Sequence, residues 1–275
     1  ASAQRPDSDL GKLKAAAGKD YVQVDPAVYE MIDFAKTYSE KSQGAWDITT
    51  GVITDLWGIG TDNQRIPSNE EITAAESLVN YKDILLRPED HSVKLAKAGM
   101  SIDLGGIAKG YAVDEVRAIF AKHHIENGLI NLGASSMYAL GSNAKGGPWR
   151  IGIKHPRNDD KDTYLGIVAV SNENISTSGD YERFFEENGV RYHHIFDPKT
   201  GRPARSGVMS DSVLVDSSIE HGGMLGDMLT TILFVLGPER GMEFAHSVNG
   251  VEAMITTTDG KIYMTDGFKS HFSDL

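Results

Sequence analysis

The segment SIDLGGIAKGYAVD, residues 101–114, combines three glycines, two aspartates and one lysine directly before a stretch with helical periodicity. Backbone N–H groups of a glycine-rich turn, together with a lysine at a helix start, form many phosphate sites. Gly105 and Gly110 have the glycine spacing of the Walker pattern, but Tyr111 stands where that pattern requires lysine. Taken alone, the segment fits either a phosphate loop or a tight turn into a helix.

A second candidate lies in GDMLTTILFVLG, residues 226–237, where Asp227 and Thr231 are four residues apart and so share one helix face. A carboxylate and a hydroxyl on one face suit Mg²⁺, a hard cation that prefers oxygen ligands. The structural alternative is an aspartate that caps the helix N-terminus, followed by a threonine bonded back to the helix backbone.

Two shorter segments carry an acid–base group and an aromatic group. In HIFDPKTG, residues 194–201, a histidine comes three residues before an aspartate and a turn, and the structural alternative is a strand end. In GAWDITTG, residues 44–51, a tryptophan lies beside an aspartate and two threonines, and the alternative is a core tryptophan at a strand start. The pairs His123–His124 and His193–His194 are adjacent, so in an extended chain their rings point to opposite faces and chelate poorly.

Composition excludes several other chemistries. The 275-residue chain has no cysteine, which excludes disulfides, thiolate zinc sites and cysteine nucleophiles. It has no His-Glu-x-x-His motif, and residues 133–137 lack the last glycine of a serine-hydrolase elbow. The formal net charge of −12 argues against non-specific nucleic-acid binding and against attraction to an anionic membrane. A phosphate ligand therefore needs local neutralisation by N–H groups, lysine or a divalent metal.

The elements that must position these residues follow from hydrophobic periodicity. Helices are expected at residues 26–42, from the Ser68–Glu71 capping box to about Asn80, at 109–122 and at 227–236, with a loop at 222–224. In the third helix Val113, Val116, Ile119 and Phe120 are expected on one side. Short strands are expected at residues 129–132, 149–153, 165–170, 191–196, 212–215, 251–257 and 261–264. Residues 258–260 read as a hairpin turn and 158–162 as an exposed loop, which together predict an α+β fold with largely antiparallel sheet.

Together these segments resemble the ApbE family of FAD:protein FMN transferases, from about Ser8 to the C-terminus. The shared segments occur in the family's order with matching spacing: GAWDITTG, IDLGGIAKGYAVD, INLG (130–133), ISTSGDY (175–181), HHIFDPKTGRP (193–203) and GDMLTTILFVLG. The resemblance implies one ApbE-like flavin transferase domain over residues 1–275. It also implies a Mg²⁺-dependent enzyme that splits FAD at its pyrophosphate, transfers FMN to a threonine or serine hydroxyl of an acceptor protein, and releases AMP.

The resemblance assigns roles to individual residues. His194 would be the catalytic acid–base group. The carbonyl of Gly106 and the side chains of Asp227 and Thr231 would hold Mg²⁺. The FAD-binding residues would be Ala45, Trp46, Asp47, Asp103, Lys109, Asp180 and Ile195. In this reading, the 101–114 segment is a phosphate-and-metal loop that leads into a helix.

The sequence also departs from the family pattern. The N-terminal strand pair usual in the family is missing before RPDSDLGKLKAAAG, so the first part of the family domain is expected to be absent. Ala134-Ser135-Ser136 stands after INLG, where the family often has Gly-Gly-Asp or a similar segment. Thr230 stands where some relatives carry an additional metal ligand.

Partners and location follow from the resemblance as well. The acceptor is expected to present a Ser/Thr-Gly-Ala-Thr-like segment, and the chain's own nearest approach, residues 176–179, runs into Asp180 instead. A Mg²⁺-dependent FAD pyrophosphatase and a non-catalytic FAD-binding protein are the alternatives. Family members generally act outside the cytoplasm, often as lipoproteins. An extracytoplasmic location, at the cell surface or on the periplasmic side, is therefore expected, with membrane attachment only through a lipid anchor upstream of residue 1 and no nucleic-acid partner.

Overall fold

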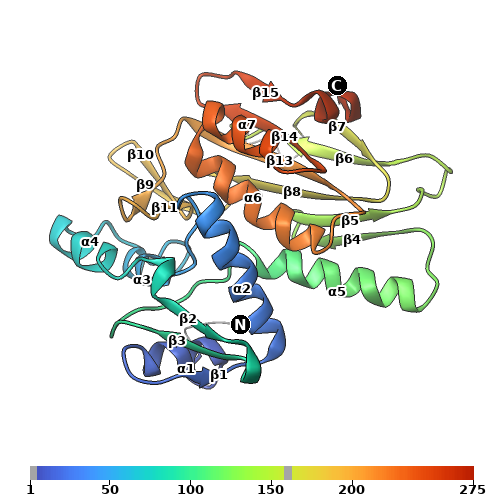
Figure 1. The fold of residues 1–275 in the computed structure, drawn as a ribbon. Coiled ribbons are helices and arrows are strands. Elements are labelled where there is room, and N and C mark those ends of the chain that lie inside the picture. The colour runs from blue at the N-terminus through green and yellow to red at the C-terminus, as the bar shows by residue number, and fades with distance from the viewer. Residues whose placement is uncertain (1–4, 158–162) are drawn as a thin grey trace. The chain divides into compact units, whose positions relative to one another are not determined.

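The computed structural model describes residues 5–157 and 163–275, and the chain forms two compact units (Figure 1). Unit 1 comprises Ala1–Gly106 and Arg183–Ala204, and unit 2 comprises Ile107–Glu182 and Arg205–Leu275. The fold is α+β and the strand pairs of its sheets are antiparallel, as the sequence predicts. The loop predicted at residues 158–162 lies outside the described residues, and the single family domain stays a prediction.

Unit 1 is built from small sheets and short helices. Its helices are α1 (Asp9–Ala16), α2 (Pro26–Lys41), α3 (Gly51–Trp57) and α4 (Asn69–Glu76), with 3₁₀ turns at Tyr81–Asp83 and Pro88–Asp90. Strands β1 (Val22–Gln23), β3 (Ser92–Leu95) and β2 (Ile84–Arg87) form a sheet in that order. Two hairpins follow later in the chain, β9 (Phe184–Glu187) with β10 (Val190–His193) and β11 (Phe196–Asp197) with β12 (Arg202–Pro203).

Local capping explains where the unit 1 helices begin and end. The Asp25 side chain accepts from Ala27 N with proline in the first turn of α2, and the predicted Ser68–Glu71 capping box is present on α4. Helix α4 ends at Glu76, earlier than predicted, because the N–H groups of Leu78 and Val79 bond three residues back instead of four. The strand predicted at 191–196 is also divided between β10 and β11.

Unit 2 contains the larger sheets. Its six-stranded sheet has the order β15 (Ile262–Met264), β14 (Val251–Thr257), β13 (Val208–Asp216), β8 (Glu173–Gly179), β5 (Ser136–Leu140) and β4 (Gly128–Leu132). A three-stranded sheet has the order β16 (Phe272–Asp274), β7 (Tyr164–Val170) and β6 (Trp149–Lys154). Its helices are α5 (Ala108–Lys122), α6 (Gly222–Leu236), α7 (Pro238–Ser247) and α8 (Asp266–His271).

The six-stranded sheet is covered on both faces. On one face, Leu214 of β13 and Met254 of β14 pack against the three-stranded sheet. Their partners there are Ile151 of β6 and Val168 of β7. The other face carries α5 and α6, and Figure 1 shows α6 running across the strands. On that face Tyr138 of β5 packs with Val113 of α5. The prediction that Ile119 shares this buried side is wrong, since Ile119 is 52% exposed.

The loop predicted at residues 222–224 is wrong, because these residues form the first turn of α6. The glycines there serve a contact between helices and not a loop. A Cβ atom on Gly223 would collide with the carbonyl oxygen of Gly110 in α5, and a Cβ atom on Gly110 would collide with the carbonyl oxygen of Gly223. The two helices therefore touch main chain to main chain at this point.

Candidate functional site

Asp227 is the centre of the site in unit 2. It lies inside α6 and only 4% of it is exposed, so it is not the helix cap that the structural alternative required. Its Oδ2 accepts the Gly110 N–H at 3.1 Å, and its Oδ1 accepts the Ser136 hydroxyl at 2.8 Å. The Lys109 Nζ lies 3.6 Å from Oδ1. Two donors and one cation therefore stabilise a negative charge that burial alone would penalise.

The two threonines that follow Asp227 have different surroundings. The Thr230 hydroxyl donates to the carbonyl oxygen of Asp227 at 2.7 Å and accepts from the Ser178 hydroxyl at 2.8 Å. The threonine bonded back to the helix is thus Thr230, and its hydroxyl has a structural role. Thr231, the predicted metal ligand, is half-buried one helical turn after Asp227, as the four-residue spacing predicts.

In unit 1, the GAWDITTG segment forms turns that lead into α3. The Asp47 Oδ1 accepts the Thr49 N–H at 2.8 Å and the Thr49 hydroxyl at 2.6 Å, while its Oδ2 accepts the Tyr81 N–H at 2.7 Å. Burial raises the pKa of Asp47, and these three hydrogen bonds oppose that rise. The carboxylate consequently ties the segment to the 3₁₀ turn at Tyr81.

Ala45 and Trp46, the other residues predicted to line the FAD pocket, are both buried, at 4% and 6% exposed. The Trp46 backbone N–H donates to the Ser42 hydroxyl at 3.2 Å. The Trp46 Nε1 is buried and has no acceptor among the residues that the structure describes. Buried donors normally have a partner, so this indole N–H is available to a ligand acceptor.

A cavity of about 310 Å³ lies beside this segment in unit 1. Gly44, Asp47 and Tyr81 line it together with Pro198 and Lys199 of the HIFDPKTG segment. The Trp57 Nε1 also donates to the Gly201 carbonyl at 2.9 Å. Two motifs far apart in the sequence therefore meet within unit 1.

Asp103 is hydrogen-bonded to the GAWDITTG segment and to helix α3. Its backbone N–H donates to the Ile48 carbonyl at 2.8 Å, and its Oδ2 accepts the Thr54 hydroxyl at 3.0 Å. Its Oδ1 accepts the Gly105 N–H at 2.7 Å and closes the glycine turn. Gly106 is the last residue of this part of unit 1, and Lys109 belongs to unit 2.

His194 and its neighbour His193 have different hydrogen bonds. The buried His193 accepts the Ile195 N–H at Nδ1, at 3.3 Å, and its Nε2 lies 3.0 Å from the Ala204 carbonyl. The His194 Nδ1 lies 3.2 Å from the Arg183 carbonyl. A carbonyl can only accept, so the Nδ1 of neutral His194 carries the proton and its Nε2 carries the basic lone pair. This is the tautomer that a general base at Nε2 requires.

Asp180 and Ile195 complete the predicted set. Ile195 is buried in unit 1, at 4% exposed. Asp180 is in unit 2, where its two carboxylate oxygens accept from the Arg157 guanidinium at 2.7 and 2.6 Å. This two-point ion pair fixes the end of β8 to the segment after β6.

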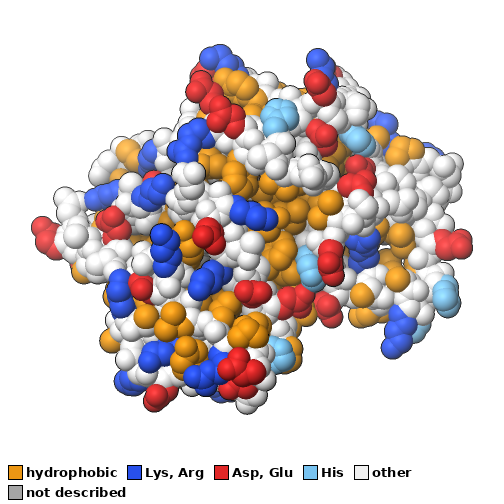
Figure 2. Space-filling view, in the orientation of Figure 1, with side chains coloured by type: hydrophobic (Ala, Val, Ile, Leu, Met, Phe, Trp, Pro, Cys, Tyr) orange, Lys and Arg blue, Asp and Glu red, His pale blue; other side chains and the backbone are white. Residues whose placement is uncertain are grey.

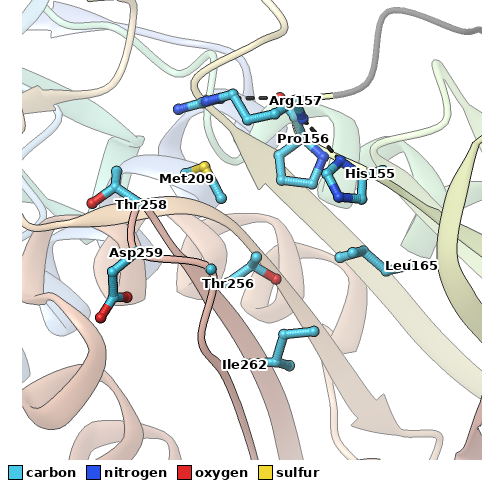
Figure 3. Close-up of a pocket in the computed structure, with 10 residues that line it drawn as sticks. His155, Pro156, Arg157, Leu165, Met209, Thr256, Thr258, Asp259 and Ile262 are labelled. Atoms are coloured by element: carbon cyan, nitrogen blue, oxygen red, sulfur yellow. Dashed lines mark hydrogen bonds between the residues drawn. The ribbon is translucent and has the colours of Figure 1, made fainter.

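A second cavity, of about 450 Å³, lies in unit 2 (Figure 3). Figure 3 shows His155, Pro156 and Arg157 on one side of it and the turn with Thr258 and Asp259 on the other. The Arg157 N–H donates to the His155 Nδ1 at 3.2 Å. None of the residues lining this cavity was predicted as a site residue.

The structure thus brings Lys109, Asp227 and Thr231 together in unit 2. It places the other predicted residues except Asp180 in unit 1, namely Ala45, Trp46, Asp47, Asp103, Gly106, His194 and Ile195. Sequence reasoning missed Gly110, which acts through its backbone N–H, and Ser136 on β5, whose hydroxyl donates to the Asp227 carboxylate on α6. The only sequence signal for Ser136 was that residues 134–136, directly after INLG, depart from the family pattern.

The other side chains that could bind a metal ion do not form clusters in the described residues. Within residues 5–157 and 163–275, no group of three or more histidine, aspartate or glutamate side chains is placed to hold a metal ion. The predicted Mg²⁺ set needs only one carboxylate, that of Asp227. Acidic and basic side chains are interspersed over the face in Figure 2. No helix in the described part of the chain has the length and apolar character to cross a membrane.

The fold and the Asp227 site define an α+β protein in which a buried carboxylate lies beside a lysine at the start of a helix. The chain belongs to the ApbE family, whose family model matches residues 1–255. It is 36% identical to an FAD:protein FMN transferase of Treponema pallidum, over 97% of this chain and 75% of that protein. A Klebsiella pneumoniae protein of the same name is 33% identical over 98% of this chain and 82% of its own length.

Solved structures agree with this assignment. The crystal structure of the ApbE protein of Thermotoga maritima superposes with a TM-score of 0.88 and 34% identity, covering 99% of this chain and 86% of that one. The flavin transferase ApbE of Vibrio cholerae gives a TM-score of 0.84 and 31% identity, covering 98% of this chain and 84% of that one.

Proposed function

We propose that this chain is an FAD:protein FMN transferase that uses Mg²⁺, transfers FMN from FAD to a threonine or serine hydroxyl of an acceptor protein, and releases AMP. The names of its relatives support the flavin transfer. The observation that carries the proposal is the buried Asp227 carboxylate with the Lys109 ammonium 3.6 Å away.

The chemistry of the donors fits Mg²⁺. The Asp227 carboxylate, the Thr231 hydroxyl and the Gly106 carbonyl are all hard oxygen ligands. The Gly110 N–H and the Ser136 hydroxyl orient the carboxylate from behind, as supporting residues do in metal sites. When bound, Mg²⁺ would neutralise the pyrophosphate and polarise its oxygens.

The chain's own residues supply the rest of the reaction. The Lys109 ammonium would lie against the phosphates and stabilise the charge that develops as the bond breaks. The acceptor hydroxyl oxygen would attack the phosphorus of the FMN half while the bond from this phosphorus to the bridging oxygen breaks, and AMP leaves with that oxygen. The hydroxyl proton would pass to the His194 Nε2, which is the basic nitrogen in the tautomer that the Arg183 carbonyl favours.

The decisive experiment mixes the protein with FAD, Mg²⁺ and an acceptor protein that carries a Ser/Thr-Gly-Ala-Thr-like segment. Mass spectrometry is expected to find an FMN adduct on the hydroxyl residue, and none on an acceptor in which that residue is replaced by alanine. His194→Ala is expected to bind FAD but to transfer about 10²–10⁴-fold more slowly. Free FMN and AMP without an adduct would instead identify an FAD pyrophosphatase, and unaltered transfer by the variant would remove His194 from the mechanism.

A further inference from the structure

The N-terminus of α6 lacks a cap from its own chain segment. The residue before it, His221, has a left-handed backbone with φ of 56°, and its side chain makes no capping hydrogen bond. The N–H groups of Gly223 and Met224 donate instead to Oδ1 and Oδ2 of Asp114, at 2.8 and 2.9 Å. Asp114 lies on α5, so a carboxylate of one helix satisfies the first turn of another and faces the positive end of its dipole.

A second contact between the same helices runs in the opposite direction. The Gly110 N–H of α5 donates to the Asp227 Oδ2 of α6 at 3.1 Å. Gly110 and Asp114 are one turn apart on α5, and Gly223 and Asp227 are one turn apart on α6. Each helix therefore gives one carboxylate to the backbone of the other, on either side of the contact between the two glycines.

The pairing of α5 with α6 determines where the reactive groups lie. Helix α5 carries Lys109 and helix α6 carries Asp227, and the 3.6 Å distance between them depends on how the helices are aligned. Because no side chain lies between Gly110 and Gly223, the polar contacts that flank them contribute to this alignment. Asp114 makes two of these contacts, with the N–H groups of Gly223 and Met224.

We propose that Asp114 is a positioning residue for the metal site: by holding the first turn of α6 against α5, it keeps the Asp227 carboxylate in place to receive Mg²⁺. This inference rests on the proposed function, because it concerns the same Mg²⁺ site. It differs from a purely structural role in one measurable respect, which is that loss of the contact weakens Mg²⁺ binding by protein that is still folded.

The test compares Asp114→Asn and Asp114→Ala with two controls. Glu115→Gln removes the same charge from the neighbouring, exposed position of α5. Leu214→Ala destabilises unit 2 from the sheet face opposite to the helices. Mg²⁺ binding is measured by calorimetry without FAD, at a temperature well below the unfolding transition of each variant. Hydrogen exchange of the first turn of α6 is measured alongside.

Asp114→Asn is expected to weaken Mg²⁺ binding about 10-fold, at the lower end of what loss of a supporting residue costs, and Asp114→Ala more. Both should speed amide exchange at Gly223 and Met224, and higher Mg²⁺ should restore transfer by Asp114→Asn. Glu115→Gln should match the wild type, and Leu214→Ala should lower the melting temperature without changing Mg²⁺ affinity.

Two results would overturn the inference. One is unchanged exchange in the first turn of α6 in both Asp114 variants. The other is wild-type Mg²⁺ affinity in folded Asp114→Asn that loses stability as Leu214→Ala does, which would leave Asp114 a structural residue only. If instead the wild-type protein bound no Mg²⁺, the metal requirement of the proposed function would fail together with this inference.

Discussion

Two buried aspartates of unit 2 lie in contrasting surroundings. Asp227 on α6 is 4% exposed, and both its carboxylate oxygens accept hydrogen bonds, from Gly110 and Ser136. Asp211 on β13 is 2% exposed, and neither of its carboxylate oxygens has a hydrogen-bond partner among the described residues. Burial raises the pKa of Asp211 well above its usual value. Burial without a hydrogen-bond partner thus favours the neutral form of Asp211, whereas the Asp227 carboxylate has two donors and the Lys109 ammonium beside it.

The strand pairing explains why Asp211 is left without donors. Its cross-strand neighbours in the sheet are Ser178 on β8 and Ile255 on β14. Ile255 has no polar side-chain atom, and the Ser178 hydroxyl donates to Thr230. A carboxyl group at this position occupies a place suited to an apolar side chain.

The largest expected difference between the two aspartates is in activity. Asp227→Asn should abolish measurable Mg²⁺ binding and lower transfer by at least about 100-fold, because it removes the only carboxylate of the proposed metal set. Asp211→Asn should leave both nearly unchanged. Calorimetry with Mg²⁺ and the adduct assay measure the two quantities, and an unchanged Mg²⁺ titration in Asp227→Asn would refute its role as a ligand.

The second difference is in the pH dependence of stability. Because the folded-state pKa of Asp211 is raised, its contribution to stability is fully present below the unfolded-state pKa and is lost as pH rises towards the folded-state pKa. Across that window the wild type should lose about 1.4 kcal/mol per pH unit relative to Asp211→Asn. Urea unfolding of both proteins at a series of pH values above 4 measures this slope. Parallel curves for the two proteins would mean that Asp211 is charged in the folded protein.

The smallest effect is expected for a substitution that removes one hydrogen-bond donor from Asp227, which makes its surroundings more like those of Asp211. Ser136→Ala should weaken Mg²⁺ binding by up to about 10-fold, because the carboxylate loses one of the two contacts that orient it. Ser142→Ala is the matched control, since its hydroxyl lies beyond the other end of β5 and bonds to Asn127. Equal Mg²⁺ affinities for the two variants would show that Gly110 and Lys109 suffice to hold Asp227.

The sequence predicted helices and strands correctly where capping, proline or turn residues agree with the hydrophobic periodicity. The capping box of α4, the proline start of α2 and strand β14 at Val251–Thr257 follow such signals. Strand β8, ENISTSG, was missed because most of its buried and half-buried residues are polar, and Ile175 is its one large apolar side chain. A Cβ atom on Gly222 would contact the Asn174 side chain, and one on Gly226 would contact Ser176, so the helix backbone packs directly on small polar groups.

For the site, the resemblance pointed to Asp227, Thr231 and Lys109, and the structure places these three together in unit 2. The resemblance could not point to Gly110, Ser136 or Asp114, because the contributions of these residues depend on contacts with residues distant in the sequence. A backbone N–H has no side-chain signature, and a serine or an aspartate on an element gives no sign of which distant backbone or carboxylate it reaches. Long-range geometry therefore supplied what residue types could not.

The contact between Gly110 and Gly223 has a consequence for how this protein can change. Most helix pairs can be respaced by exchanging one apolar side chain for a larger or smaller one. Here the separation is set by the size of the peptide group itself, which mutation cannot alter. Other residues of α5 and α6 can therefore vary while the spacing between the two helices at this point stays constant.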